Sequence, residues 1–458
     1  MGTISPGWRW GPFTARVPLL HLKPELPELA QGLLVANATG LAVVPLYAEH
    51  FGMGFEIAVA LVVLQSFTIY SSFLLFGEPF CPGWLTPALP LVLREATALA
   101  TPDLRTEFVN AIVLATAAVF LFFGATGLGK IFLRAIPRAL KAGIILGAGL
   151  SALYGETLPR SGDRPSRLDA YPVCVSLAVV VTLLLVFSKP LERWKQRLPW
   201  LGRLAALGVL PGFFLAMVAG PWLGEISYQG FFDYEGPFLY WPDFHGLLAQ
   251  YSVIGRGLPP ASMLLQAAPL AIAAYIIGFS DIITGTAILE EAGRDRPDDP
   301  PALDPRRTHL SIGLRNAAIA LVGGPFFPLQ GPLWTGATVV VAERWRRGPQ
   351  AMRSLMDGVA SYYLFGLPIL YFIGPALELL RPALDIAFSL TLILTGFACA
   401  YVALGMLHER VERGVALLVG ATILFFSTPT ALLLGLLLTA GLLGPDAWRR
   451  ESAILKSR

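Results

Sequence analysis

Charged residues are scarce in this chain of 458 residues: 14% are Asp, Glu, Lys or Arg, whereas 55% are hydrophobic. A water-soluble protein of this size could not bury so much apolar surface, so a soluble globular fold is excluded. The net charge of +3 is too small to indicate binding to nucleic acid. A mean hydropathy of +0.63 agrees with a chain embedded in a lipid bilayer.

Cysteine is scarce as well. Cys81, Cys174 and Cys399 lie far apart, in or beside apolar runs, and do not have the spacing of metal ligands. A disulfide framework and a protein-bound metal ion are therefore not expected. The sequence also has no HExxH, GxSxG or Walker-type motif and no paired catalytic carboxylates. We expect neither enzyme activity nor a resident cofactor, although Na⁺ could serve as a coupling ion.

A short motif rich in glycine and proline occurs twice. Residues 77–86 read GEPFCPGWLT and residues 323–335 read GGPFFPLQGPLWT, so both begin G-x-P-F-x-P and continue to Gly and Trp. Proline has no backbone donor and glycine has no Cβ, so neither copy continues a helix. Inside a bilayer, such backbone is tolerated only where protein buries it or where it lines a cavity. Two helix breaks in corresponding halves indicate a transporter's central site; a pair of ordinary re-entrant loops is the alternative.

Apolar runs of about 17–25 residues predict transmembrane helices. Two shorter runs, 84–93 and 331–342, follow the two motifs, and each predicts a half-helix preceded by a short extended segment. Together they give fourteen transmembrane elements, seven on each side of a polar stretch at 224–260. An odd number of crossings inverts the second set, so we predict an all-α polytopic fold of two inverted repeats. The longer runs lie near 29–48, 54–76, 107–124, 131–154, 170–188, 201–223, 262–289, 308–322, 357–379, 383–405, 411–427 and 429–444.

Lys and Arg in the short connections indicate the orientation in the membrane. With the N-terminus inside, most basic connections are cytoplasmic, both termini are cytoplasmic, and a bacterial inner membrane is the expected location. The outer connection 155–169, which contains Arg160, Arg164 and Arg167, is an exception. The expected parts are a cytoplasmic segment (1–27), the first repeat (28–223), an outer aromatic and acidic loop or partner-binding segment (224–260), the second repeat (261–444) and a cytoplasmic tail (445–458).

Three stretches resemble the uracil and xanthine permeases, nucleobase–cation symporters whose seven-plus-seven inverted-repeat superfamily includes the sulfate permeases. The resemblance implies a core domain of elements 1–4 and 8–11, a gate domain of elements 5–7 and 12–14, elevator-like motion, and a homodimer in the lipid bilayer. Nucleobase permeases usually carry an acid at the start of the tenth element, where this chain has Gln330, Trp334 and Thr335 instead. The matching stretches are AQGLL at 30–34 with VVPL at 43–46, IP at 136–137 with AGIILGAGL at 142–150, and GFSDIITGT at 278–286.

Asp281 is the sharpest candidate for ion coupling. It lies in the middle of the apolar run 271–289, where a charge is costly and by default functional. Thr284 and Gly285 follow at i+3 and i+4 and share its helix face. A carboxylate with a hydroxyl and exposed carbonyls suits Na⁺, whereas a desolvated carboxylate suits H⁺. A structural Asp paired to a neighbouring helix is the alternative.

The two half-helices, which we expect to begin near Gly83 and Gly331, would direct their N-termini at one cavity, and such termini favour an anionic or acceptor-rich ligand. Trp84 and Trp334 would be equivalent by the repeat and would either stack on a planar solute or form a wall. The expected function is secondary transport of a small planar or anionic, nucleobase-like solute with Na⁺ or H⁺. The alternative is a sulfate-permease-like transporter or exchanger of inorganic or carboxylate anions; an ion channel or intramembrane enzyme is less favoured. The expected substrate-binding residues are Asn37, Gly83, Trp84, Thr86, Ser280, Asp281, Gln330, Gly331, Trp334 and Thr335.

Overall fold

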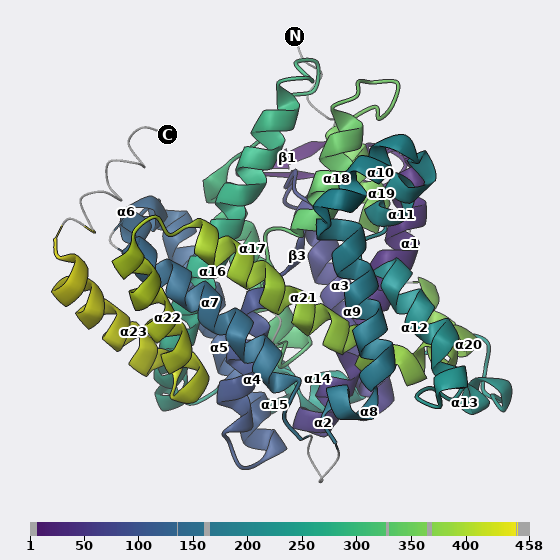
Figure 1. Cartoon of the computed structure of the whole chain (residues 1–458), viewed down its shortest axis with the longest axis horizontal. Helices are drawn as coiled ribbons and strands as arrows, with labels where there is room; N and C mark the ends of the chain where they lie inside the picture. Colours follow the sequence, from purple (N-terminus) through teal and green to yellow (C-terminus); the bar gives the residue numbers. More distant parts are fainter. Residues whose placement is uncertain are drawn as a thin grey trace.

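The computed structural model describes residues 7–134, 136–159, 165–326, 329–363, 369–445 and 447, without the side chains of 34–39, 130, 133–134, 196 and 206. Helices form nearly all of its secondary structure (Figure 1). Four of the described helices are each long and apolar enough to cross a bilayer, and two more crossings result if each of two bent helix pairs is one span. The chain is thus a polytopic helical membrane protein, as predicted. The four helices are Phe55–Leu74, Pro102–Thr126, Ala261–Gly293 and Gly374–Gly405.

Each predicted element of the first half coincides with helical structure, and the first break contains a short strand. Prolines at the first turn begin many of these helices, because a missing N–H costs nothing there. The elements are β1 (Trp8–Trp10), β2 (Phe13–Ala15), α1 (Leu26–Leu41), α2 (Val44–Phe51), α3 (Phe55–Leu74), β3 (Gly83–Trp84), η1 (Thr86–Ala88), α4 (Leu89–Thr97), α5 (Pro102–Thr126), α6 (Gly129–Arg134), α7 (Arg138–Gly155), α8 (Arg167–Ala170), α9 (Pro172–Phe187), α10 (Lys189–Arg197), α11 (Pro199–Ala206) and α12 (Leu210–Leu223).

The second half repeats this order of elements. After three short helices, α13 (Gln229–Phe232), α14 (Phe244–Gln250) and α15 (Val253–Arg256), it begins with a long helix and reaches the second break at β4. The elements are α16 (Ala261–Gly293), α17 (Pro305–Val322), β4 (Gln330–Gly331), α18 (Thr335–Trp345), α19 (Leu355–Tyr363), η2 (Ile369–Phe372), α20 (Gly374–Leu380), η3 (Arg381–Ala383), α21 (Leu384–Gly405), α22 (Arg410–Phe425), α23 (Thr428–Leu438) and a π-helical turn, η4 (Thr439–Leu443).

Helix packing shows the inverted repeat. The contact of α1 with α19 has its counterpart in that of α16 with α5, and the contact of α7 with α22 has its counterpart in that of α21 with α9. Within each half, α9 packs on α12 and α22 packs on α23. The helices form a core group (α1–α5 and α16–α19) and a gate group (α7, α9, α12 and α21–α23), and β3 lies near the centre of the molecule (Figure 1).

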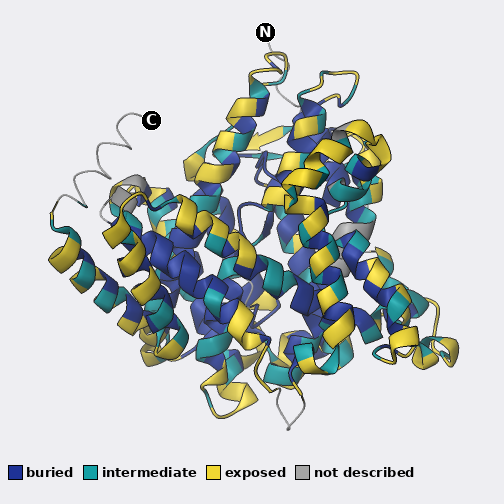
Figure 2. Ribbon diagram, viewed as in Figure 1, coloured by how far each residue is buried: buried dark blue, intermediate teal, exposed yellow. Residues whose placement is uncertain are grey.

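The connections are segregated between the two ends of the helices. In Figure 1, α6, α10, α11 and β1 lie toward the upper end, whereas α2, α8, α13, α14 and α15 lie toward the lower end. The upper elements adjoin the basic connections predicted to be cytoplasmic. Buried residues lie mainly on the inward parts of the helices (Figure 2). Exposed apolar side chains include Phe425 (66%) and Leu433 (62%). Apolar side chains on an outward face suit contact with lipid.

The stretch 224–260, predicted to be an interfacial loop, is partly helical and packs against the helical body. Asp243 and Ser252 cap α14 and α15 by accepting hydrogen bonds from the backbone N–H groups of Gly246 (2.7 Å) and Gly255 (3.1 Å). Leu247 is fully buried, and α14 packs on α3. Hydropathy missed these helices because each has at most seven residues and contains polar caps.

A second correction concerns the predicted boundary between 357–379 and 383–405. The chain is continuously helical from Gly374 to Gly405, because the short 3-10 segment η3 joins α20 to α21 without a turn. Pro382 sits at the start of a helical segment, where it is compatible with helix geometry. The break before this helix lies earlier, and residues 364–368 are outside the described range.

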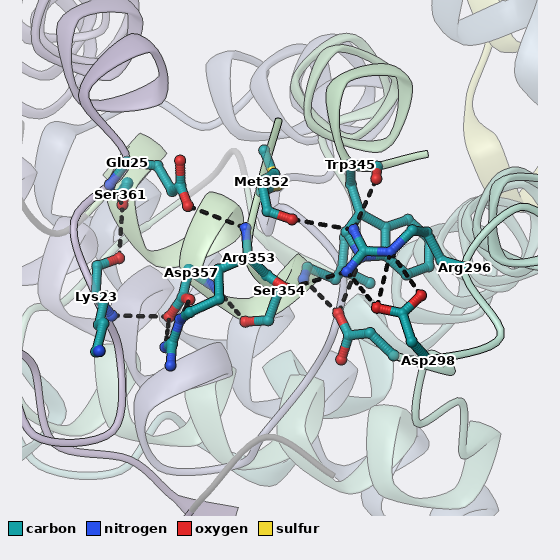
Figure 3. A network of polar contacts seen from close by, with 12 residues as sticks. Lys23, Glu25, Arg296, Asp298, Trp345, Met352, Arg353, Ser354, Asp357 and Ser361 are labelled. Atoms are coloured by element: carbon teal, nitrogen blue, oxygen red, sulfur yellow. Dashed lines mark hydrogen bonds and ion pairs between the residues drawn. The ribbon is translucent and has the colours of Figure 1, made fainter. Parts of the chain in front are cut away.

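A buried arginine joins the two connections beside the second half-helix (Figure 3). The Arg296 side chain is fully buried and donates to the carbonyl oxygens of Trp345 (2.7 Å), Met352 (3.0 Å) and Arg353 (3.0 Å). Its hydrogen bonds to Asp298 hold the pKa of that exposed carboxyl below its ordinary value. This arrangement ties the C-terminal end of α18 to the connection between α16 and α17.

Candidate functional site

The two sequence motifs lie side by side at the centre of the molecule. Strands β3 and β4 pair in antiparallel orientation, with Gly83 opposite Gly331 and Trp84 opposite Gln330. The pairing continues outside the strands, because the Leu85 N–H donates to the Leu329 carbonyl (3.0 Å) and the Trp334 N–H donates to the Cys81 carbonyl (2.7 Å). The predicted meeting of two extended segments is confirmed; Phe327 and Pro328 lie outside the described residues.

Glycine is required at the crossing point because the two backbones approach closely. A Cβ on Gly331 would lie 2.9 Å from the Leu85 nitrogen and 3.0 Å from the Trp84 carbonyl carbon. A Cβ on Gly83 would lie 2.9 Å from the Trp334 Cβ and 3.0 Å from its nitrogen. Real Cβ atoms do not approach backbone so closely, so a side chain at either position would push the segments apart.

Helix α17 holds the second segment in place. Asn316, fully buried, accepts from the Gln330 N–H (2.9 Å) and donates to the Gln330 carbonyl (3.0 Å). Arg315, also buried, donates to the Gly331 carbonyl (2.8 Å) and to the Gln330 side-chain oxygen (3.2 Å), and the Gln330 amide donates to Thr68 (2.9 Å). Gln330 and Gly331, predicted to bind substrate, therefore do not line the cavity; their polar groups are used to fix the segment.

The half-helices begin later than predicted. Gly83 and Gly331 belong to the paired strands, and the helical structure starts at η1 (Thr86–Ala88) and at α18 (Thr335–Trp345). In α18 the first N–H to bond back is that of Thr338, to the Trp334 carbonyl (2.9 Å), so the preceding N–H groups of the first turn have no hydrogen-bond partner among the described residues and can bond a ligand. On the other side Pro87 has no N–H to offer.

A cavity of about 410 Å³ lies between the paired segments, α16 and the gate group. Both tryptophans line it, as predicted from their equivalent positions, and Asp281 is the only charged side chain among the described lining residues. Eight of the predicted site residues come together here: Gly83, Trp84, Thr86, Ser280, Asp281, Thr284, Trp334 and Thr335.

Asp281 makes no hydrogen bond or ion pair with any side chain that the structure describes, and the residue lines the cavity. The hydroxyls of Ser280 and Thr284 donate to carbonyls of their own helix, of Ile276 (3.0 Å) and of Ser280 (2.9 Å), which leaves their lone pairs available. Gly285 does not line the cavity, because its open side packs on Phe80, whose ring a Cβ would approach to 2.9 Å. Asn37 lies within α1, and its side chain is outside the described residues.

Sequence reasoning missed Gln65, on α3. Its side chain is 1% exposed, lines the cavity, and its Oε1 has no hydrogen-bond partner among the described residues. Tyr363 also lines the cavity, and its hydroxyl donates to the Pro82 carbonyl. A lone amide in the apolar run of α3 is the signal that could have identified Gln65, because polar side chains inside a membrane-spanning segment usually have a functional role.

A cluster of buried charges bridges the core and gate groups at the other end of their interface. The Arg167 guanidinium, 6% exposed, contacts Glu49 of α2 (3.0 Å), Glu156 at the end of α7 (3.5 Å) and Asp385 of α21 (3.1 Å). Ser389 donates to Glu156. Arg167, an exception to the predicted charge asymmetry, is therefore in a protein interior rather than in a loop facing water.

Comparison with known proteins supports the fold. No family model and no curated protein sequence matches the chain. Among solved structures, the transmembrane domain of a cyanobacterium bicarbonate transporter, BicA, matches with a TM-score of 0.51 and 16% identity over 91% of this chain and 99% of that one. The anion transporter SLC26A9 matches with a TM-score of 0.53 and 13% identity over 91% of this chain and 65% of its own length. At this level of identity, these matches establish a shared transporter fold.

Proposed function

We propose that this chain is a secondary transporter that carries a small anion across the membrane together with Na⁺ or H⁺. The observation that carries the proposal is the cavity at the junction of the two half-helices, where the free N–H groups of α18 and one unpaired carboxylate, Asp281, meet. Helix N-termini favour anions. Transport of bicarbonate by one protein of the same fold and of anions by another supports this choice over a nucleobase.

Coupling follows from the charges in the cavity. An anion about 4 Å from an ionised Asp281 would be repelled by roughly 4 kcal/mol at an effective dielectric constant near 20. A proton on the carboxyl, or a Na⁺ held by it with the Ser280 and Thr284 oxygens, removes this repulsion. The anion and the cation therefore stabilise each other's binding, which is the thermodynamic condition for symport.

A planar, nucleobase-like solute is the second candidate. Trp84 and Trp334 both line the cavity, and indole rings stack on planar ligands. A planar oxyanion would use the same rings, so the two candidates differ in charge rather than in shape.

A panel of ligands tested by thermal unfolding of the purified protein distinguishes them. We expect bicarbonate, carboxylates or inorganic anions to raise the Tm in the presence of Na⁺ or at lowered pH. At a ligand concentration 100 times the Kd, the free energy of unfolding should increase by about 2.7 kcal/mol. A rise in Tm with uracil or xanthine but with none of the anions would overturn the anion proposal.

Replacement of Gln65 tests whether it contacts the solute. Gln65→Met keeps the side-chain length but removes the amide, so we expect the apparent affinity for the transported anion to fall about ten-fold, the equivalent of one hydrogen bond of roughly 1.4 kcal/mol. Stability should not fall, because the amide oxygen has no partner to lose. The measurement is the concentration dependence of uptake, with Gln229→Met, an exposed position on α13, as the matched control.

The elevator mechanism is also part of the proposal. The cavity extends to Val209 and Val402, near the ends of α12 and α21 that adjoin the basic connections, while the Arg167 cluster joins the core and gate groups at the opposite end. Because basic connections are expected on the cytoplasmic side, we interpret this arrangement as inward-facing. For the core group to move outward, the contact between Glu49 and Arg167 has to break.

Glu49→Gln should therefore favour the outward-facing state. Ser151, which is 7% exposed and lies beside the cluster, is a suitable position for a cysteine probe. If Glu49→Gln shifts the equilibrium between the two states by roughly 1 kcal/mol, this cysteine should react about five-fold faster with a membrane-impermeant thiol reagent than it does without the Glu49 replacement. Cys81 and Cys174 are buried, and Cys399, which lines the cavity, is replaced by Ser in all the variants compared. Glu378→Gln, which removes an exposed ion pair with Arg381, is the control; equal rates in both variants would contradict the gate assignment.

A further inference from the structure

Two short helices, α10 and α11, join the gate helices α9 and α12 at the end of the molecule that carries the basic connections (Figure 1). The axis of α10 turns 67° away from that of α9. Helix α9 contains no charged residue, whereas α10 (KPLERWKQR) contains five, so we expect α9 to lie in the bilayer and α10, at this angle, to run along the membrane surface. Leu201 of α11, 8% exposed, packs this connection onto the protein.

One side of α10 carries a row of positive charges. Lys189, Arg193 and Arg197 are spaced four residues apart, so they lie on one helix face, and all three are exposed. Within the described part of the chain no acidic side chain forms an ion pair with any of them; the Glu192 carboxylate is taken by Lys195 (2.8 Å). Like charges at this spacing destabilise an isolated helix by roughly 0.2–0.5 kcal/mol a pair. Anions bound from outside the chain would remove this repulsion.

Two tryptophans flank the charged row. Trp194 on α10 and Trp200 on α11 are each 60% exposed. Indole rings accumulate at the depth of lipid headgroups, where one edge is apolar and the N–H finds water or phosphate. Basic side chains beside exposed indoles on a helix parallel to the surface are the features of an interfacial helix that binds acidic lipid.

We infer that α10 and α11 form a binding surface for anionic phospholipid headgroups, with Lys189, Arg193 and Arg197 contacting the phosphates and Trp194 and Trp200 inserted at headgroup depth. Guanidinium groups suit this ligand because they bind phosphate in a bidentate manner. The position of the helices at the end with the basic connections places them at the cytoplasmic leaflet, which carries the acidic lipids. The inference concerns lipid binding and does not depend on which solute is transported.

The test is thermal unfolding of the full chain in detergent, with phosphatidylglycerol added at increasing concentrations. We expect phosphatidylglycerol to raise the Tm and phosphatidylcholine to raise it much less. In the variant K189Q/R193Q/R197Q the phosphatidylglycerol concentration for half of the rise should increase on the order of 100-fold, because each basic residue near an acidic surface contributes roughly 1 kcal/mol. Inorganic phosphate at the same concentrations should change the Tm of this variant and of the unmodified chain equally, because the solute cavity is the same in both.

A matched variant, R410Q/R413Q, removes two exposed charges from the start of α22 at the same end of the molecule. It should keep the phosphatidylglycerol response of the unmodified chain, and a bimane label on a cysteine at Glu192 should be quenched by brominated phosphatidylglycerol only where the row is intact. Equal responses in the K189Q/R193Q/R197Q variant and the unmodified chain would overturn the inference. So would equal effects of the two lipids, or a response to inorganic phosphate that is present in the unmodified chain and lost in the K189Q/R193Q/R197Q variant.

Discussion

Asp281→Asn is expected to abolish accumulation of the solute against its gradient. The carboxylate is the only charged group among the described residues that line the cavity, and it has no partner among them, so its charge state is free to change with a bound Na⁺ or H⁺. Asparagine has the same shape, but its amide neither takes up a proton in the transport cycle nor carries the negative charge that attracts Na⁺. The measurement is gradient-driven accumulation in proteoliposomes, compared with the unmodified chain.

The fold should tolerate this replacement. Removing an unpaired charge from a low-dielectric site relieves its desolvation, so the Tm of Asp281→Asn should be at or above that of the unmodified chain. Solute counterflow separates two roles: it persists if Asp281 serves only the coupling ion and disappears if the residue also holds the solute. Unchanged accumulation under both a Na⁺ and an H⁺ gradient would show that Asp281 is structural.

Gly331→Ala is expected to impair both stability and transport. The new methyl group would lie 2.9 Å from the Leu85 nitrogen and 3.0 Å from the Trp84 carbonyl carbon, and backbone atoms held in the strand pair cannot move aside. Overpacking of this kind costs about 1–3 kcal/mol. The displaced segment would also carry Trp334 and the start of α18 away from the cavity, so solute counterflow should fall at least ten-fold.

Gly414→Ala is the matched control, because this glycine lies in the exposed first turns of α22 with nothing within 4 Å of a new Cβ. Alanine in a helix is favoured over glycine by about 1 kcal/mol, so this variant should be as stable as the unmodified chain or more so. Transport by Gly331→Ala at the level of Gly414→Ala would mean that the strand pair does not position the solute.

Much of the architecture could be predicted because hydropathy and the two motifs report directly on it. Long apolar runs identified the elements that became α3, α5, α16 and α21, and the repeated G-x-P-F-x-P motif identified the two segments that pair as β3 and β4. Glycine and proline exclude a continuous helix, and inside a bilayer a non-helical backbone is tolerated only where protein buries it or where it lines a cavity. The lone carboxylate of Asp281 was informative for the same reason.

The roles of individual polar residues could not be predicted in this way. Gln330 was expected in the cavity but is bonded by Arg315 and Thr68, whereas Gln65 was overlooked although it lines the cavity without a partner for its oxygen. The difference is set by neighbours from other helices, which sequence spacing within one helix does not describe. Arg167 shows the same effect, since its three carboxylate partners come from three separate segments. The homodimer and the cytoplasmic location of both termini stay predictions.

Accumulation of a small anion in proteoliposomes under an imposed Na⁺ or H⁺ gradient tests the central claim most directly. The proposal predicts saturable uptake above equilibrium, which collapses when one of the two cation gradients is dissipated. Bicarbonate or another small anion should compete with the transported solute for this uptake. Flux that does not saturate and follows only the anion's own electrochemical gradient would contradict it, because that behaviour belongs to a channel. Gradient-driven uptake of uracil or xanthine without competition from any anion would contradict it as well.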